Sequence, residues 1–322
     1  SRRDLAAAIR TLAVATALVV TLVPALAETR VEERIELSEN GSLVLETDAG
    51  GVIVRGGSGD GVLVVVRSTR DDLRDQMTFA FESTGSEARV TARRSGSERE
   101  FRRWARSRNG SRLTFEVEVP SGASVSIDTS GGKIEVSDVR GTVRADTSGG
   151  KIVLSRIASD VFADTSGGAI RVEEIDGDAE LDTSGGSIEA RRVTGAVSAD
   201  TSGGSIVLFD VDGDVSADTS GGRIEVAGAG GRVLADTSGG GIEVSFAPGN
   251  ARGGALETSG GRLTVWIDPG DGLTIDAEAS GGSNRTDRPL SVTGPMDRGE
   301  LRGTSNGGGA TLKLRASGGG IR

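Results

Sequence analysis

The segment from Asp128 to Ala145 decides the fold of this chain. It reads Asp128-Thr129-Ser130-Gly131-Gly132-Lys133-Ile134-Glu135-Val136-Ser137-Asp138-Val139-Arg140-Gly141-Thr142-Val143-Arg144-Ala145. The opening pentapeptide Asp-Thr-Ser-Gly-Gly recurs at a constant interval along the chain, beginning at Asp128, Asp146, Asp164, Asp182, Asp200, Asp218 and Asp236. Such a period is typical of repeat architectures, in which each repeat packs only on its neighbours.

Each repeat contains two stretches in which apolar and polar residues alternate, one around Ile134 and Val136 and the other around Val143 and Ala145. Alternation with a period of two predicts short β-strands, and the intervening glycines predict turns. A repeat this short cannot bury an apolar face alone, so its coils must stack. The sequence therefore predicts an all-β, single-chain β-solenoid (a β-helix) with 18-residue coils and two short strands per coil. The pattern leaves the handedness undetermined.

The same alternation predicts which side chains point into the coil. Ile134, Val136, Val143, Ala145 and Thr147 share one parity and are expected inside, together with their copies in the following repeats. An inward row of Thr argues against ice binding, which requires exposed Thr on a flat face. The paired glycines that begin at Gly131 predict a corner with positive φ, because glycine adopts that conformation without a Cβ penalty.

The regular repeat has less regular neighbours on both sides. Thr47-Asp48-Ala49-Gly50-Gly51 is a degenerate copy upstream, so residues 28–127 are expected to form an N-terminal β cap of the same solenoid, with an Arg-rich hairpin or loop. Residues 128–253 are the regular repeats, and residues 254–322 are expected to form irregular C-terminal coils and a cap. The aromatic residues Phe209, Phe246 and Trp266 are interpreted as fillers of wider coils.

The N-terminus resembles a secretory leader. Arg2, Arg3 and Arg10 precede the apolar run from Leu12 to Val23, and Ala25-Leu26-Ala27 has the small-x-small pattern of a cleavage site. We therefore expect residues 1–27 to be a signal peptide cleaved near Ala27. The mature protein is then extracytoplasmic, in the periplasm, on the cell surface or secreted, and the choice between general and twin-arginine export stays open.

Composition excludes several kinds of chemistry. The chain has no His and no Cys, so it can form neither a Ser-His-Asp triad nor a thiolate or imidazole metal site. Its net charge of −10 argues against nucleic acid as a partner, because binding that polyanion requires the opposite charge. We expect no cofactor and no metal site.

The repeated Asp residues, stacked from Asp128 to Asp236, would repel one another. Calcium bridging could offset this repulsion, since calcium accepts oxygen ligands in loose geometry. The preferred interpretation is that each Asp accepts backbone N–H groups from its own Ser-Gly-Gly corner, as in an Asx turn.

The most promising contact for a partner is the segment from Arg89 to Arg112, which carries nine Arg in an otherwise acidic chain. Arg side chains interleaved with an aromatic residue could hold an anionic lipid headgroup, an acidic envelope polymer or a surface protein. The alternative is a hairpin tip that its charges keep solvated. The candidate partner-binding residues are Arg93, Arg94, Arg99, Arg102, Arg103, Trp104, Arg106 and Arg108.

A different class of function is a polysaccharide-active β-helix enzyme that uses paired carboxylates. Its acids would come from Glu173, Glu174, Asp176 and Asp178. Because acids in this chain mostly copy a structural pattern, whereas catalysis needs one asymmetric pocket, we predict no catalytic residues and no enzyme.

The lead-in Val117-Glu118-Val119-Pro120-Ser121-Gly122-Ala123-Ser124-Val125, followed by repeated T-S-G-G-x-I-x-V-x-x-V-x-G, resembles the bacterial putative-adhesin family of β-strand repeat proteins, also called the toastrack domain. The likeness runs from about Val44 to the C-terminus. It implies a non-enzymatic extracytoplasmic solenoid, in some members linked to envelope-stress sensing or surface attachment. Self-association of such rods, end to end or laterally, is also expected.

Overall fold

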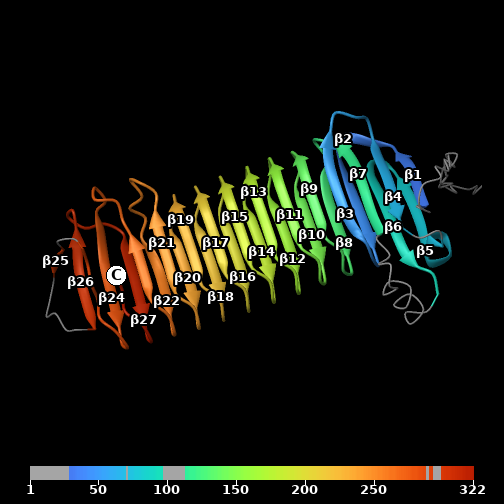
Figure 1. Cartoon of the computed structure of the whole chain (residues 1–322). Helices are drawn as coiled ribbons and strands as arrows, with labels where there is room; N and C mark the ends of the chain where they lie inside the picture. The colour runs from blue at the N-terminus through green and yellow to red at the C-terminus, as the bar shows by residue number, and fades with distance from the viewer. Residues whose placement is uncertain (1–28, 70–71, 97–112, 288–289, 293–298) are drawn as a thin grey trace, which may run out of the picture.

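The computed structural model describes residues 29–69, 72–96, 113–287, 290–292 and 299–322. These residues form a straight rod of stacked strands, with the N-terminal elements at one end and β24 to β27 at the other (Figure 1). The expected leader at residues 1–27 lies outside the described residues. In the described part of the chain, no helix is long and apolar enough to cross a membrane.

Two sheets run along the rod, and each coil contributes one strand to each sheet. The first has 12 strands in the order β1-β4-β7-β3-β9-β11-β13-β15-β17-β19-β21-β23, and the second has 15 in the order β25-β26-β24-β27-β22-β20-β18-β16-β14-β12-β10-β8-β2-β6-β5. We call them the 12-stranded and the 15-stranded sheet. Within the repeats all pairing is parallel. It is in register, as in Val143 with Val161, except for a shift between Ala227 and Ala229 where β19 pairs with β21. The all-β repeat fold predicted from the sequence is confirmed.

The repeat strands have nearly constant lengths. In the 12-stranded sheet they are β9 (Ile134–Val139), β11 (Ile152–Ile157), β13 (Ile170–Ile175), β15 (Ile188–Val193), β17 (Ile206–Val211), β19 (Ile224–Ala229), β21 (Ile242–Phe246) and β23 (Leu263–Trp266). In the 15-stranded sheet they are β8 (Ser124–Thr129), β10 (Val143–Thr147), β12 (Val161–Thr165), β14 (Ala179–Thr183), β16 (Val197–Thr201), β18 (Val215–Thr219), β20 (Val233–Thr237) and β22 (Gly254–Thr258).

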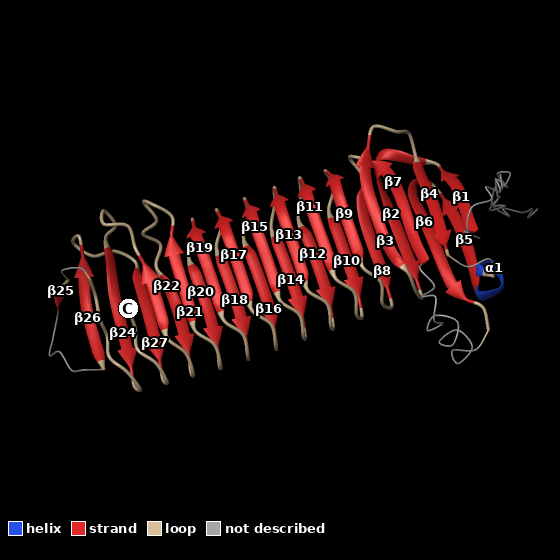
Figure 2. Cartoon of the chain, viewed as in Figure 1, coloured by secondary structure: helices blue, strands red, loops and turns tan. Residues whose placement is uncertain are grey.

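The N-terminal elements continue both sheets without a break, because β3 pairs with β9 and β2 pairs with β8. Antiparallel strands then end the rod (Figure 2). In the 12-stranded sheet, β4 lies between β1 and β7, and in the 15-stranded sheet β5 pairs with β6. The elements are β1 (Thr29–Ile35), β2 (Leu37–Thr47), β3 (Gly51–Gly57), β4 (Val62–Ser68), α1 (Leu73–Gln76), β5 (Met77–Ser83), β6 (Gly85–Arg94) and β7 (Leu113–Pro120).

At the C-terminal end the two sheets have different lengths. The 12-stranded sheet ends at β23, whereas the 15-stranded sheet continues past β22 through four more strands. These are β24 (Leu273–Ala279), β25 (Ser291–Val292), β26 (Glu300–Ser305) and β27 (Thr311–Ala316). Among the described residues, two isolated bridges extend the shorter sheet, from Leu263 to Ile321 and from Ile321 to Asn284. The inner face of the longer sheet therefore overhangs its partner.

The core is a column of small apolar side chains between the sheets. Ile134, Val136, Val143, Ala145 and Thr147 are all buried, as their parity predicts. The Thr row is buried in every regular coil, which agrees with the argument against ice binding. Each buried hydroxyl is satisfied locally, since Thr147 Oγ1 donates to the Gly132 carbonyl at 3.2 Å and accepts from the Gly150 N–H at 3.3 Å.

The Ser-Gly-Gly corner requires glycine for a different reason from the predicted one. Neither Gly131 nor Gly132 is among the described glycines with positive φ. A Cβ built on Gly132 would instead lie 1.7 Å from the Gly50 carbonyl oxygen, and one on Gly150 would lie 1.7 Å from that of Gly132. The second glycine of each pair is therefore needed because successive coils approach closely. The first glycine is not constrained in this way, since a Cβ on Gly149 meets nothing within 4 Å.

Candidate binding surfaces of the rod

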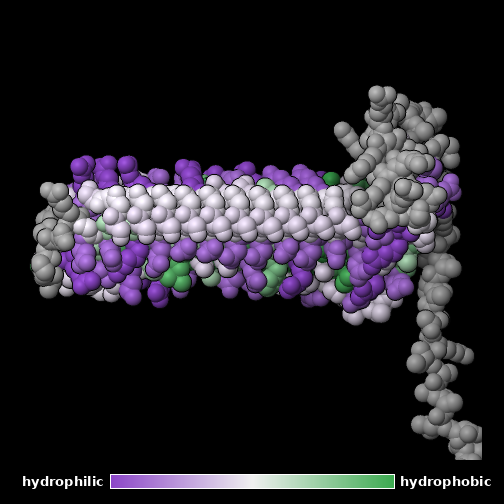
Figure 3. Space-filling model, turned by 90° about the horizontal axis from the view of Figure 1, so that it is seen from below, coloured by the Kyte–Doolittle hydropathy of each residue, from purple (hydrophilic) through white to green (hydrophobic). Residues whose placement is uncertain are grey.

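The Ser-Gly-Gly corners form a smooth stripe along the rod. Figure 3 looks at the edge where the even-numbered repeat strands end and shows a pale band bordered by hydrophilic rows. Ser148 and Gly149 are exposed at this corner, as are their copies in the neighbouring coils. The stripe offers hydroxyl groups and backbone to solvent and carries no charge of its own.

A row of carboxylates runs beside this stripe on the 15-stranded sheet. Strand register places Asp146 between Asp128 and Asp164, and the row extends from Glu46 on β2 to Glu257 on β22. Arginines meet both ends of the row. Arg89 Nη1 lies 3.0 Å from Glu46 Oε1, and Arg315 on β27 pairs in register with Glu257. We call this row the acidic ladder.

The acidic ladder is electrostatically strained. Burial raises the pKa of Asp146, Asp182 and Asp200, and the neighbouring carboxylates raise the pKa of each further. The predicted Asx turn is wrong, because the side chain that closes each corner is the Thr hydroxyl rather than the Asp carboxylate. Among the described residues, no cluster of three or more acidic side chains is arranged to hold a metal ion.

The opposite corner carries a row of alternating charge. Asp138, Arg156, Glu174, Arg192 and Asp210 occupy equivalent positions in five successive coils, and all have positive φ between 54° and 63°. Left-handed backbone is rare for such residues. An open groove of about 690 Å³ runs over this corner. Its charges pair along the rod, as where Arg192 Nη2 lies 3.0 Å from Glu174 Oε1.

The acids of the enzyme hypothesis have structural partners at this corner. Glu173 Oε1 lies 2.7 Å from Arg192 Nη2, and Glu174 shares the same guanidinium. Asp178 Oδ1 accepts the backbone N–H of Ala196 in the next coil at 2.7 Å. Asp176 lies on the wall of the open groove. These acids stabilise the stacking of coils, and no enclosed pair of carboxylates is formed by them.

Two of the eight predicted partner-binding residues are described, and both are paired with acids. Arg93 Nη1 lies 3.2 Å from Asp48 Oδ1, and its other nitrogen contacts Glu46. The backbone N–H of Arg94 donates to Asp48 Oδ2 at 2.9 Å. These contacts hold the pKa of Asp48 below its ordinary value, although burial alone would raise it. The other six, Arg99, Arg102, Arg103, Trp104, Arg106 and Arg108, lie outside the described residues.

Only one of the three aromatic residues interpreted as fillers is buried. Phe246 is 7% exposed and belongs to the core. Phe209 lies on the outer face of β17, where the Arg191 guanidinium stacks over its ring at 4.4 Å. Trp266 ends β23 and is 50% exposed, the most of any large hydrophobic side chain in the described residues. The interpretation was wrong for Phe209 and Trp266, because both occupy strand positions whose side chains point outward. The outward side chains of Arg191 and Phe209 are neighbours because the two residues pair in register.

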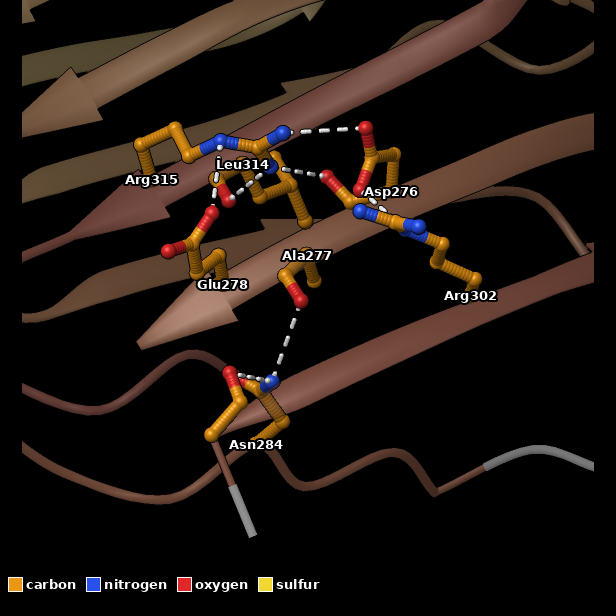
Figure 4. Close-up of polar contacts among 8 residues, drawn as sticks. Asp276, Ala277, Glu278, Asn284, Arg302, Leu314 and Arg315 are labelled. Carbon is orange, nitrogen blue, oxygen red and sulfur yellow. Dashed lines mark hydrogen bonds and ion pairs between the residues drawn. The ribbon is translucent and has the colours of Figure 1, made fainter. Parts of the chain in front are cut away.

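Trp266 borders a pocket beneath the overhang of the longer sheet. The pocket has a volume of about 410 Å³ and a mainly apolar lining, with Ile275, Leu301 and Leu314 on the side of the longer sheet. Ion pairs link the two strands β24 and β27 that form this side of the pocket. Arg315 Nη2 on β27 lies 2.9 Å from Asp276 Oδ2 on β24, and Arg315 Nε lies 3.4 Å from Glu278 Oε2 (Figure 4). The irregular spacing of this region gave no sequence signal for the pocket.

No family model matches the chain, and no curated protein matches it. Similar solved structures include a putative cell adhesion protein from Clostridium sporogenes, with 10% identity, a TM-score of 0.28 and coverage of 91% of this chain and 97% of that one. Another is a putative adhesin from Bacteroides fragilis, with 10% identity, a TM-score of 0.29 and coverage of 91% and 95%. At these TM-scores neither likeness carries an argument about this chain's binding sites.

Proposed function

We propose that the chain is an exported, non-catalytic rod that acts as a scaffold or adhesin at the bacterial cell envelope. Its partner would be an envelope polymer, an anionic lipid or a surface protein. The observation that carries the proposal is the strand register, which stacks equivalent outward positions of successive coils into rows, such as the Asp row from Asp128 to Asp236. Such rows suit contact with an extended partner, whereas catalysis needs a single asymmetric site.

The enzyme alternative has less support. A glycosidase needs one acid with a raised pKa and a second carboxylate on the other side of the scissile bond. Glu173 and Glu174 instead share the guanidinium of Arg192 on an open surface. The scaffold proposal also includes a link to envelope stress. Damage to a wall polymer would change the fraction of the protein that is bound to it, and this change could signal the damage.

The Arg-rich segment is the proposed contact of the scaffold. Arg93 and Arg94 anchor its start to Glu46 and Asp48, so its later arginines are the residues assigned to the partner. Arginine binds phosphate and carboxylate through two parallel hydrogen bonds, which gives the contact a preference for anionic polymers and lipids.

Co-sedimentation tests this proposal. The chain from Glu28 onward is mixed with purified cell wall, or with vesicles of phosphatidylglycerol, across a salt series. It is compared with a variant in which Arg99, Arg102, Arg103 and Arg106 are changed to Gln. A second variant with the exposed residues Arg34, Arg74, Arg232 and Arg252 changed to Gln removes the same charge from the rod and is the matched control.

We expect salt-sensitive binding that only the first variant loses. Equal loss in both variants would mean that overall charge governs binding and that the segment makes no particular contact. An absence of binding by the unmodified chain to wall and vesicles would contradict the envelope proposal.

A further inference from the structure

The pocket beneath the overhang has the features of a small-molecule site. Most pockets that bind small ligands have an apolar lining with a few polar groups that fix orientation. Here Val265, Ile267, Ile275 and Leu290 pack against the core but stay partly exposed, and all four line the pocket. They remain uncovered because the 12-stranded sheet ends at β23, while the opposite sheet continues.

One wall of the pocket holds an unsatisfied hydrogen-bond acceptor. The Nδ2 of Asn284 donates to the carbonyl oxygens of Ala277 at 3.2 Å and Gly299 at 2.9 Å, which fixes the orientation of its amide (Figure 4). Its Oδ1 is buried and has no hydrogen-bond partner. A buried acceptor without a donor is destabilising. Because that oxygen is enclosed, Asn284 shapes the wall of the pocket, and contacts to a ligand have to come from the accessible groups at the rim.

The rim of the pocket provides an aromatic face and planar polar groups. Trp266 lines the pocket and is half exposed. Arg322 Nη2 lies 3.1 Å from Asp287 Oδ2, and both side chains are more than 60% exposed. The exposed Arg285 lies beside them on the pocket lining. A ring that has an apolar C–H face and hydroxyl groups at its edge matches this arrangement.

We propose that this pocket binds a terminal or internal ring of a neutral sugar chain, stacked on Trp266 and hydrogen-bonded at its edge by Asp287, Arg285 and Arg322. This inference rests on the proposed function and deepens it, because it names glycan as the polymer class that the rod contacts. The site lies beside β24 and β26 at one end of the rod, whereas β6, which ends at Arg94, lies at the other end (Figure 1).

Fluorescence of Trp266 provides a direct test. The chain has two Trp, and in the full chain Trp104→Phe leaves Trp266 as the single reporter. The probes are neutral glycan fragments, namely soluble oligosaccharides of N-acetylglucosamine, with sodium dodecanoate as an apolar-chain comparison. We expect a saturable change in emission with the glycan fragments and none with dodecanoate. A response to dodecanoate alone would overturn the proposal in favour of a lipid pocket.

Calorimetry on substituted chains separates stacking from simple burial. Trp266→Ala should weaken glycan binding at least about tenfold, and Trp266→Phe should restore most of it. Leu234→Ala, at another exposed hydrophobic residue on the opposite sheet, is the control and should bind as the unmodified chain does. Unchanged binding by Trp266→Ala would overturn the pocket assignment. If that variant and the unmodified chain still sediment equally with cell wall, the proposed function stands without this site.

Discussion

The guanidinium group of Arg156 forms two hydrogen bonds with the carboxylate of Asp138, its equivalent one coil earlier. Arg156 Nε lies 2.6 Å from Asp138 Oδ1, and Nη2 lies 2.9 Å from Oδ2. Both residues have left-handed backbone, with φ of 54° and 63°. Two positions that are unfavourable for non-glycine residues are therefore joined to each other, so side-chain pairing between coils compensates in part for local backbone strain.

This pair makes stability depend on pH. The hydrogen bond from Arg156 lowers the pKa of Asp138 below its ordinary value of 3.8. The stabilisation is then fully present above 3.8 and is lost as the pH falls through the lower folded-state pKa. We expect Asp138→Asn, which tolerates the same backbone, to lower the melting temperature at pH 7 but not at pH values well below that pKa.

Thermal unfolding of both proteins across pH and salt checks this expectation. Because both side chains are about half exposed, the difference should be small and should shrink at high salt. Arg156→Gln should reproduce the effect of Asp138→Asn, and the double variant should be no worse than either alone. An additive double variant would show that the two side chains do not act as a pair.

The second prediction concerns the glycine that stacks against the preceding coil. Gly150→Ala would place a Cβ 1.7 Å from the Gly132 carbonyl oxygen, so the coils must move apart. We expect a loss of about 3 kcal/mol or more in the free energy of unfolding, at the upper end of overpacking effects. Gly149→Ala is the matched control, since its Cβ meets nothing within 4 Å. Chemical denaturation should show near-native stability for the control, and equal destabilisation of both variants would contradict the stacking explanation.

The features predicted from the sequence are those that depend on local periodicity. Alternation around Ile134 and Val143 specifies the strands and the inward Thr, because parity along a strand decides which side chains are buried. The role of Gly132 could not be predicted in the same way. Its constraint comes from the Gly50 carbonyl of another coil, and the sequence alone gives no measure of that approach.

The candidate sites were less predictable than the fold. Aligning the repeats with one another reveals the alternating charges of Asp138, Arg156 and Glu174. It does not reveal their left-handed backbone, for which the one sequence signal is the glycine at the equivalent position 228. The pocket at Trp266 depends on two sheets of unequal length and on how β24 to β27 pair with one another. Such features arise from pairing between distant segments, so a repeat pattern does not contain them.

The third prediction concerns the buried Thr row. Thr165 Oγ1 donates to the Gly150 carbonyl at 3.1 Å and accepts the Gly168 N–H at 3.2 Å. Thr165→Val keeps the shape of the side chain but removes both hydrogen bonds and leaves two backbone groups unsatisfied. We expect it to cost about 1–3 kcal/mol in the free energy of unfolding. Thr165→Ser retains the hydroxyl and should cost less; if Ser proved as harmful as Val, the methyl group rather than the hydrogen bonds would be the stabilising feature.

The last prediction concerns the acidic ladder. Burial raises the pKa of Asp182 above its ordinary value of 3.8, and the carboxylates of Asp200 and Asp164 raise it further. The folded state then binds a proton at higher pH than the unfolded state does, so the carboxylate destabilises the fold as the pH rises from 3.8 through the folded-state pKa. This destabilisation persists at neutral pH. Asp182→Asn should therefore be more stable than the unmodified chain at pH 7, by up to about 1 kcal/mol at low salt.

The same comparison at acid pH and at high salt distinguishes repulsion from other causes. The advantage of Asp182→Asn should vanish at pH values well below 3.8, where the carboxyl is neutral in both states, and should shrink in high salt. Asp60→Asn, at an exposed acid outside the ladder, is the control and should change little. A ladder variant less stable than the unmodified chain at pH 7 would mean that a favourable contact, such as a bound cation, outweighs the repulsion between the stacked carboxylates.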